Sequence, residues 1–222
     1  MLTSHAEEQH RFHYWNSRTL YLLDDHLASD GDEYPCTLLD QLIELNARDR
    51  DKPILLVVKS LGGSIATMNA VLDYISAISA PVYTQAIGDV ASAAATIAAF
   101  GAKGHRYISP TARTMIHEPW AMGSGGKCDE LEIEAKELKR FREGYFKLMS
   151  ELTGQELVRI KRDLKKDTWF WPDEAVKYGL CDKVGILPEL LNMPTPEVAS
   201  YMTPSFHEDS TVSHNIKCKN WE

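Results

Sequence analysis

The sequence lacks a segment that could cross a bilayer. Its longest apolar stretch, Val90–Phe100, is much shorter than the ~20 residues that a transmembrane helix needs. The first residues, Met1–Phe12, are acidic and rich in histidine, without the apolar core of a signal peptide or the Arg- and Ser-rich pattern of a transit peptide. We therefore expect a chain that neither spans nor binds a membrane.

Positive charge and closely spaced cysteines are also scarce. The 24 Lys and Arg residues are outnumbered by 32 Asp and Glu residues, and the net charge of −8 argues against a nucleic-acid-binding protein. No two cysteines have C-x-x-C spacing, which favours reduced thiols in a cytoplasmic protein over a disulfide framework or a zinc site. We expect no metal and no cofactor. The cysteines are Cys36, Cys128, Cys181 and Cys218.

The sequence does contain the composition of a globular domain and a regular order of elements. Hydrophobic residues make up 44% and charged residues 25% of the 222, which suits one well-buried domain. Short apolar runs are followed by glycine-containing turns and by segments of helical spacing, an order typical of an α/β fold with parallel strands. The predicted strands are 18–23, 54–58, 82–87, 106–108 and 114–116, and the predicted helices are 37–45, 65–78 and 91–100.

One long helix is predicted at 127–152, after a glycine-rich break at 123–126 and before Gly154. At ~1.5 Å per residue it would be about 40 Å long, more than a small sheet needs for cover, so we expect it to project and to pack against a partner. No internal repeat is visible. We divide the chain into a short N-terminal segment (1–17), one domain (18–187) and a polar, proline-containing tail (188–222).

Ser92 is the first candidate for chemistry. It follows a predicted strand and begins a helix of small residues, a position that exposes the hydroxyl and directs backbone N–H groups toward whatever bonds to it. Taken alone, an N-cap serine is the simpler interpretation.

The Gly62–Gly63 pair is the second candidate, because adjacent glycines allow a main-chain N–H to face a ligand. No Gly-Lys-Ser/Thr follows, so the turn is not a phosphate loop. Paired with the N–H of Ala93, it could hold an oxyanion. A bare turn is the alternative interpretation.

His117 and Asp167 complete the set. His117 ends an apolar strand just before Pro119, and the other seven histidines lie in the N-terminal segment, loops or tail. Asp167 enters an aromatic cluster, where we expect partial shielding from water to strengthen its pairing with an imidazole N–H. In isolation each residue could equally lie on the surface.

Together these residues predict a catalytic triad. Ser92 would attack a peptide carbonyl, His117 would remove and return the proton, and Asp167 would orient the imidazole. The N–H groups of Gly63 and Ala93 would form the oxyanion hole.

These same motifs resemble the ClpP family of self-compartmentalised serine peptidases. SLGGS is similar to the family's SPGGS, GDVASAAA to G-x-AASM-x-A, MIHEP to MIHQP, and DEAVKYGLCD to xEAxxYGLxD. The order and the separations also agree, with Ser92 placed 29 residues after Gly63 and His117 placed 25 after Ser92. The resemblance covers about three quarters of the chain, residues 18–184.

The resemblance implies a crotonase-like α/β fold of repeated β-β-α units, with a projecting handle of a helix and a strand at about 120–154. It also implies a homo-oligomer of two stacked seven-membered rings, a tetradecamer that encloses a chamber. Peptide or unfolded-protein substrate would add a β-strand against Gly62–Ile65 and against a strand around Trp120–Gly123. Pro119 and Trp120 would line the pocket for the residue before the cut, with Gly62 and Ile65 also binding substrate.

Several positions depart from the family. Leu61 replaces a proline beside the oxyanion glycines, and Lys166 replaces an arginine before the triad aspartate. Positions of the family's ring-edge docking pockets carry smaller or polar groups, which removes aromatic binding area, so we expect coupling to a divergent AAA+ unfoldase or to none. The altered positions are Leu55, Val57, Ala77 and Gln85, while Tyr107 fits the family.

Four alternatives remain open at this stage. The chain could be a structural or regulatory subunit without peptidase activity, although all three triad residues are present. It could be a viral head-maturation protease, which differs in biology and not in chemistry. A signal-peptide-peptidase-like enzyme would use a lysine base, and an acyl-CoA hydratase or isomerase would have no use for Ser92 and His117 as a pair.

Overall fold

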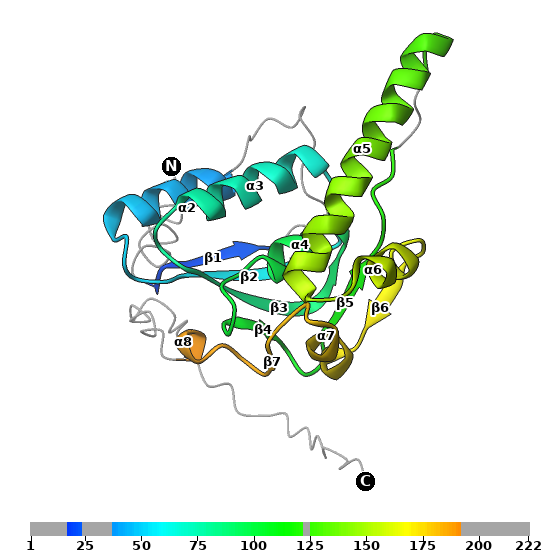
Figure 1. The fold of residues 1–222 in the computed structure, drawn as a ribbon. Helices are drawn as coiled ribbons and strands as arrows, with labels where there is room; N and C mark the ends of the chain where they lie inside the picture. Colours follow the sequence, from blue (N-terminus) through cyan, green and yellow to red (C-terminus); the bar gives the residue numbers. More distant parts are fainter. Residues whose placement is uncertain (1–16, 24–36, 122–124, 192–222) are drawn as a thin grey trace, which may run out of the picture.

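The computed structural model describes residues 17–23, 37–121 and 125–191, and every structural statement below refers to these residues. A mainly parallel sheet forms the centre, with strand order β1-β2-β3-β4-β7 (Figure 1). A second branch leaves β3 through β5 and ends in β6, which is antiparallel to β5. The strands are β1 (Thr19–Leu22), β2 (Ile54–Ser60), β3 (Val82–Ala91), β4 (Arg106–Ile108), β5 (Arg113–Ile116), β6 (Thr168–Phe170) and β7 (Lys183–Val184).

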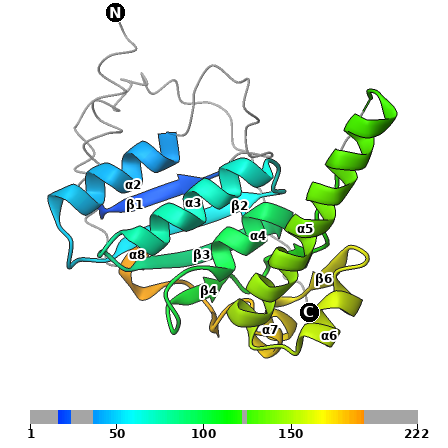
Figure 2. The same ribbon diagram turned by 45° about the horizontal axis from the view of Figure 1, so that its top comes forward.

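Helices cover the sheet, and α2 and α3 lie side by side across one face (Figure 2). Lys59 is the only exposed residue of β2, which is why this strand reads as a nearly continuous apolar run. Seven of the eight residues of α4 are buried, because it packs between the sheet and the helices α3 and α5. The helices are α2 (Thr37–Arg48), α3 (Ile65–Ala77), α4 (Ser92–Ala99), α5 (Cys128–Thr153), α6 (Leu157–Asp163), α7 (Pro172–Tyr178) and α8 (Pro188–Leu191).

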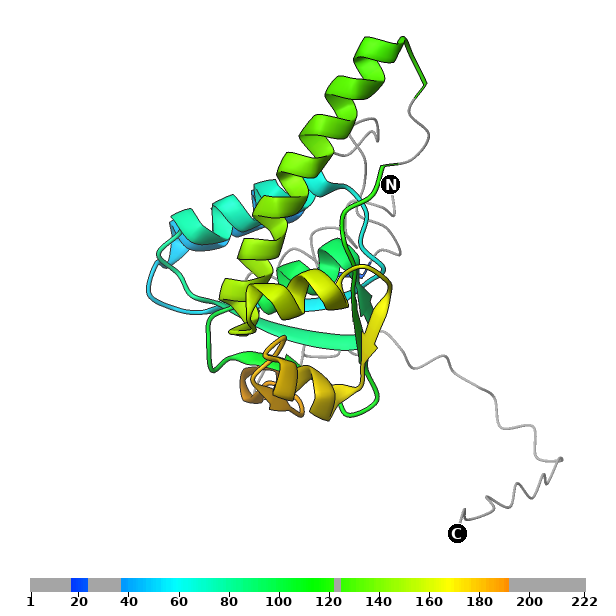
Figure 3. The same cartoon turned by 45° about the vertical axis from the view of Figure 1, so that its right-hand side comes forward.

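The long helix α5 projects from this body, as its length predicted (Figure 3). Its N-terminal part, 128–137, is exposed throughout, and its buried residues are confined to its C-terminal half. Gly154 ends it in a left-handed conformation, φ 73°, with its N–H bonded to Ser150 O. None of the described helices is long and apolar enough to cross a membrane.

Two local expectations differ from the structure. The strand predicted to end at Ile87 continues to Ala91, because β5 supplies a new partner where pairing with β2 becomes irregular. Gly88, with φ 58°, lies inside this strand and is not the turn after it. No strand is assigned to 120–121, the described part of the handle strand expected around Trp120–Gly123, and 122–124 lie outside the described residues, as do 1–16, 24–36 and 192–222.

Gln85 is completely enclosed and ties the C-terminal part of the domain to the sheet. Its amide nitrogen lies 3.1 Å from both Ser109 Oγ and Gly185 O, and its amide oxygen accepts the N–H of Leu187 at 2.7 Å. Leu55 and Val57 are also buried. Three of the positions considered for a docking pocket therefore do not present their side chains at the surface of the single chain.

Candidate active site

Ser92, His117 and Asp167 meet although they lie on three separate segments. Ser92 Oγ is 2.7 Å from His117 Nε2, and His117 Nδ1 is 3.0 Å from Asp167 Oδ1. The imidazole therefore bridges a hydroxyl and a carboxylate through its two ring nitrogens. This is the geometry in which a carboxylate fixes the tautomer that leaves Nε2 free to accept a proton.

Ser92 occupies an abrupt junction between strand and helix. Ala91 is still extended, with φ −131° and ψ 155°, and α4 begins at the next residue. Ser92 itself has φ 56°, a left-handed conformation that is uncommon for a residue with a side chain. Such strain costs on the order of 1–3 kcal/mol and persists only where the surroundings impose it. In this conformation the hydroxyl lies 2.7 Å from His117 Nε2.

The Gly62–Gly63 segment packs directly against this junction. A Cβ added to Gly62 would come within 2.7 Å of Ala91 O, 2.8 Å of Ser92 Cβ and 2.9 Å of the Ala93 nitrogen. Both glycines have positive φ, 95° and 141°, and Gly62 N–H donates to Ser60 Oγ at 3.2 Å. Only a residue without a side chain allows this approach of the two backbones.

Ala93 lies in the first turn of α4, where N–H groups have no acceptor within the helix. The contact with Gly62 brings this turn and the glycine segment together beside Ser92. Two backbone segments with suitable donors therefore flank the hydroxyl, which is the arrangement that an oxyanion hole needs.

The pairing of β5 with β6 places His117 and Asp167. Met115 pairs with Trp169 and Ile116 with Thr168, and the same antiparallel register carried one residue further sets His117 opposite Asp167. The His117 side chain is 17% exposed, whereas that of Asp167 is 65% exposed. The expected shielding of Asp167 from water is therefore wrong for the single chain, because the adjacent Trp169 and Trp171 are themselves 41% and 58% exposed.

A buried contact supports α4 from behind. Thr96 Oγ1 lies 3.3 Å from Ser92 O and 2.8 Å from the hydroxyl of Tyr145 on α5. Burial raises the pKa of Tyr145 to about 12, so this hydroxyl stays protonated and available for hydrogen bonding. The base of the projecting helix is thus joined to the turn that carries Ser92.

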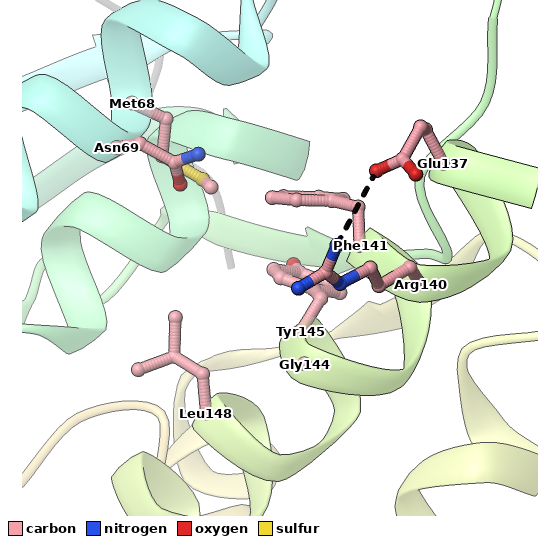
Figure 4. Close-up of a pocket in the computed structure, with 8 residues that line it drawn as sticks. All are labelled: Met68, Asn69, Glu137, Arg140, Phe141, Gly144, Tyr145 and Leu148. Atoms are coloured by element: carbon pink, nitrogen blue, oxygen red, sulfur yellow. Dashed lines mark ion pairs between the residues drawn. The ribbon is translucent and has the colours of Figure 1, made fainter. Parts of the chain in front are cut away.

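Tyr145 also lines a cavity of about 440 Å³ between α3 and α5 (Figure 4). Met68 and Asn69 face it from α3, and its rim carries an ion pair of Glu137 with Arg140 at 4.0 Å. None of the four predicted substrate-binding residues lines this cavity. Ile65 and Pro119 are half-buried and Trp120 is 60% exposed, so their contact with substrate stays a prediction. The four residues are Gly62, Ile65, Pro119 and Trp120.

Several supporting residues were not singled out from the sequence. Ser60, the first residue of SLGGS, anchors the glycine turn, and its place in that motif was the available signal. Glu118, beside His117, forms an ion pair at 3.5 Å with Arg142 of α5. No local pattern connects these last two positions, which are 24 residues apart.

Within the described ranges, no group of three or more His, Cys, Asp and Glu side chains could hold a metal ion. At Ser92 a hydroxyl lies beside an imidazole, with Oγ 2.7 Å from His117 Nε2. The fold and this geometry define an α/β protein with a hydrogen-bonded Ser–His–Asp arrangement at the end of a parallel sheet.

Comparison with known proteins then identifies the family. The Clp protease family model matches residues 28–186. The chain is 37% identical over 162 residues to the ATP-dependent Clp protease proteolytic subunit 1 of Bifidobacterium longum (strain NCC 2705), an alignment that covers 73% of this chain and 66% of that relative. The chain belongs to the Clp protease family. The mixed α/β architecture with its parallel-strand sheet is consistent with the fold expected from the resemblance.

Proposed function

We propose that the chain is a serine endopeptidase that cleaves peptides or unfolded polypeptides with Ser92, His117 and Asp167 as its triad. The single observation that carries the proposal is the continuous contact from Ser92 Oγ through the imidazole to Asp167, at 2.7 Å and 3.0 Å. His117 takes the proton of Ser92 as the hydroxyl attacks the scissile carbonyl and returns it to the leaving amine. Asp167 stabilises the imidazolium that forms in between.

The oxyanion of the tetrahedral intermediate is held by the N–H groups of Gly63 and Ala93. Their support is the approach of the glycine turn to the first turn of α4. Backbone dipoles fixed near the attacked carbon would need no reorganisation during the reaction. Loss of one such donor typically lowers kcat by about 10²–10³-fold.

We further propose that the enzyme works as a closed homo-oligomer of two stacked heptameric rings. The exposed N-terminal half of α5 supports this, because Leu131 and Ile133 are 37% and 62% exposed on a helix that leaves its own domain. The relative's name describes an ATP-dependent protease, so an AAA+ unfoldase is the corresponding partner class. Among the altered docking positions Ala77 is exposed on the single chain, and its small side chain is the reason to expect a divergent unfoldase or none.

The test is cleavage of short fluorogenic peptides and labelling by a fluorophosphonate, each with the wild type, with Ser92→Ala and with a control. Ser76→Ala is a matched control because Ser76 lies on α3, outside the triad, and its hydroxyl donates to Leu72 O of the same helix. We expect Ser92→Ala to lose labelling and to lower kcat by at least about 10⁴-fold, because the removal of a triad serine lowers kcat by at least this much. Ser76→Ala should retain both.

Labelling that persists in Ser92→Ala would reject this serine as the nucleophile. An assembled wild type that neither cleaves nor labels would instead favour a structural subunit. Sizing chromatography of the same preparations tests the ring proposal separately, and a monomer that cleaves peptides at full rate would contradict it.

A further inference from the structure

We propose that Arg113 is a positioning residue that keeps Asp167 opposite His117, by clamping β6 to the rest of the sheet. This inference rests on the proposed triad. Arg113 itself lies outside the sequence motifs of the site, and the inference begins from the register of the two strands that carry the acid and the base.

Residues that alternate along β5 and β6 share one face of the sheet. On β5 these are Arg113 and Met115, followed by His117, because side chains two apart point the same way. Antiparallel pairing sets Met115 opposite Trp169, so the same register places Arg113 opposite Trp171 at one end and His117 opposite Asp167 at the other. The clamp and the proposed acid–base pair therefore lie at the two ends of one short strand pair.

The guanidinium of Arg113 contacts both neighbouring strands. Toward β3 it makes a bidentate ion pair with Asp89, at 2.6 Å and 3.0 Å, and Asp89 is its direct register partner. Toward β6 its central carbon lies 4.6 Å from the ring centroid of Trp169 and 5.7 Å from that of Trp171. One charged group thus joins three strands, and β6 is the outermost of them.

β6 is also held by Phe170, which is buried against Tyr178 with ring centroids 4.5 Å apart, and by Thr168, whose hydroxyl donates to Asp163 O at 2.6 Å. The contact with Arg113 fixes the strand on its Trp169 side. β6 has three residues, and β5 is its one strand partner within the described sheet. Asp167 is 65% exposed, so its own side chain has no close packing to fix it. Its position follows from Thr168 and Trp169, whose places are set by the strand pairing and by the stacked guanidinium.

The contacts of Arg113 should affect the rate of peptide cleavage more than the stability of the fold. Exposed ion pairs and exposed cation–π contacts each contribute little to the stability of a fold. A displacement of ~1 Å at a catalytic group, by contrast, can lower the rate by ~10²-fold. A weak clamp on the strand next to the carboxylate is therefore sufficient to change catalysis.

The decisive experiment is a double-mutant cycle on peptide cleavage. Arg113→Met keeps the length of the side chain and removes its charge, and we expect kcat to fall about 10- to 100-fold with KM nearly unchanged. Arg113→Lys, which keeps a cation between Asp89 and the rings, should recover part of this loss. In an Asp167→Asn background, Arg113→Met should lower kcat by less than about twofold, because its effect on the reaction passes through Asp167.

The pH profile gives a readout that a merely structural residue would not move. A displaced carboxylate stabilises the imidazolium less, so the acidic limb of kcat/KM should move to lower pH in Arg113→Met. Lys183→Met removes a comparable cation–aromatic contact, with Tyr107 at 5.3 Å on the opposite branch of the sheet, and should leave both kcat and the profile unchanged. An equal loss with or without Asp167, or an unchanged kcat and profile, would overturn the proposal.

Hydrogen exchange of the peptide 165–171, followed by mass spectrometry, tests the clamp without activity. We expect faster exchange there in Arg113→Met than in the wild type or Lys183→Met. If the wild type proves inactive, the proposed function fails while this measurement still decides the clamp. Unchanged exchange in 165–171 would reject it in either case.

Discussion

The two branches of the sheet that leave β3 hold the same chemical pair in different surroundings. The branch through β4 and β7 carries Arg106 with Asp182, and the branch through β5 carries Arg113 with Asp89. Both pairs are bidentate, with Nη2–O distances of 2.6 Å and Nε–O distances of 3.0 Å. Their exposure differs, at 5% and 19% for the first pair and 39% for each side chain of the second.

The buried pair organises the fold. Arg106 also donates to Ala99 O at 3.0 Å and Leu152 O at 3.2 Å, so it meets the carbonyl ends of α4 and α5. Asp182 additionally accepts the N–H groups of Gly104 and Arg106. Removal of Asp182 would leave the buried Arg106 guanidinium without its carboxylate, and removal of the Arg106 side chain would leave Asp182 with only its two backbone N–H donors.

The half-exposed pair does little for the fold, but its branch carries both His117 and Asp167. Water competes for each of its contacts, so its contribution to stability is small. The comparison teaches that burial, and not the residue types or the distances, separates a structural ion pair from one that can tune a nearby site. Regions that serve binding and catalysis are drawn from the less stable part of a fold.

The largest expected effect separates the two aspartates. Asp167→Asn should lower kcat for peptide cleavage by about 10⁴-fold, because the amide supports the wrong imidazole tautomer. Its melting temperature should stay close to that of the wild type, because the side chain is mostly exposed. Asp182→Asn should show the reverse order, with a lower melting temperature and a much smaller loss of kcat. Similar kinetic losses in the two variants would break the comparison.

The two arginines should differ in the free energy of unfolding. Arg106→Met removes the cation from Asp182, which keeps only its two backbone N–H donors, and removes the donor to Ala99 O and Leu152 O, so we expect a loss of about 3 kcal/mol. Arg113→Met should cost much less, because water screens its half-exposed pair with Asp89. Urea unfolding of both variants measures the difference, with assembly state held constant. Equal losses would show that solvent exposure does not determine how much these ion pairs contribute to the free energy of unfolding.

Acid should reduce the contribution of the Arg106–Asp182 ion pair to the free energy of unfolding. Burial alone would raise the pKa of Asp182, but Arg106 and the N–H groups of Arg106 and Gly104 more than offset this, and the net pKa is lowered. Its stabilising contribution is therefore complete above the ordinary aspartate pKa of about 3.9 and is lost as pH falls through the lower, folded value. The difference in unfolding free energy between wild type and Asp182→Asn should shrink below about pH 4. A difference that stays constant down to acid unfolding would contradict this assignment.

The smallest expected effect is that of Lys183→Met on β7. It removes the cation over Tyr107 and should cost about 0.5–1 kcal/mol of unfolding free energy, without a kinetic effect. Thermal melts and peptide kinetics on one preparation check both parts. A loss comparable to that of Arg106→Met would mean that β7 depends on its edge contact more than on the buried pair.

Much of the architecture follows from local pattern. The apolar, β-branched run at 54–58 predicted β2 because both of its faces are covered, and the long amphipathic segment before Gly154 predicted α5 to within a residue at each end. The clustering of Ser92, His117 and Asp167 agrees with their proposed roles, although those roles stay a prediction. The prediction that these three residues form a triad came from their residue types and from the order of the motifs.

Local sequence pattern did not predict where β3 ends or how exposed Asp167 is. β3 extends past Gly88 only because β5, more than twenty residues later, pairs with it, and Asp167 is open to water because β6 is an edge strand. The left-handed Ser92 and the clamp of Arg113 on Trp169 likewise depend on segments far apart in the chain. The sequence by itself determined which segments are helices and strands and which side chains can do chemistry, because period and polarity are local properties. Register, burial and strain were decided by the tertiary structure, because each is a relation between segments that meet only in the folded chain.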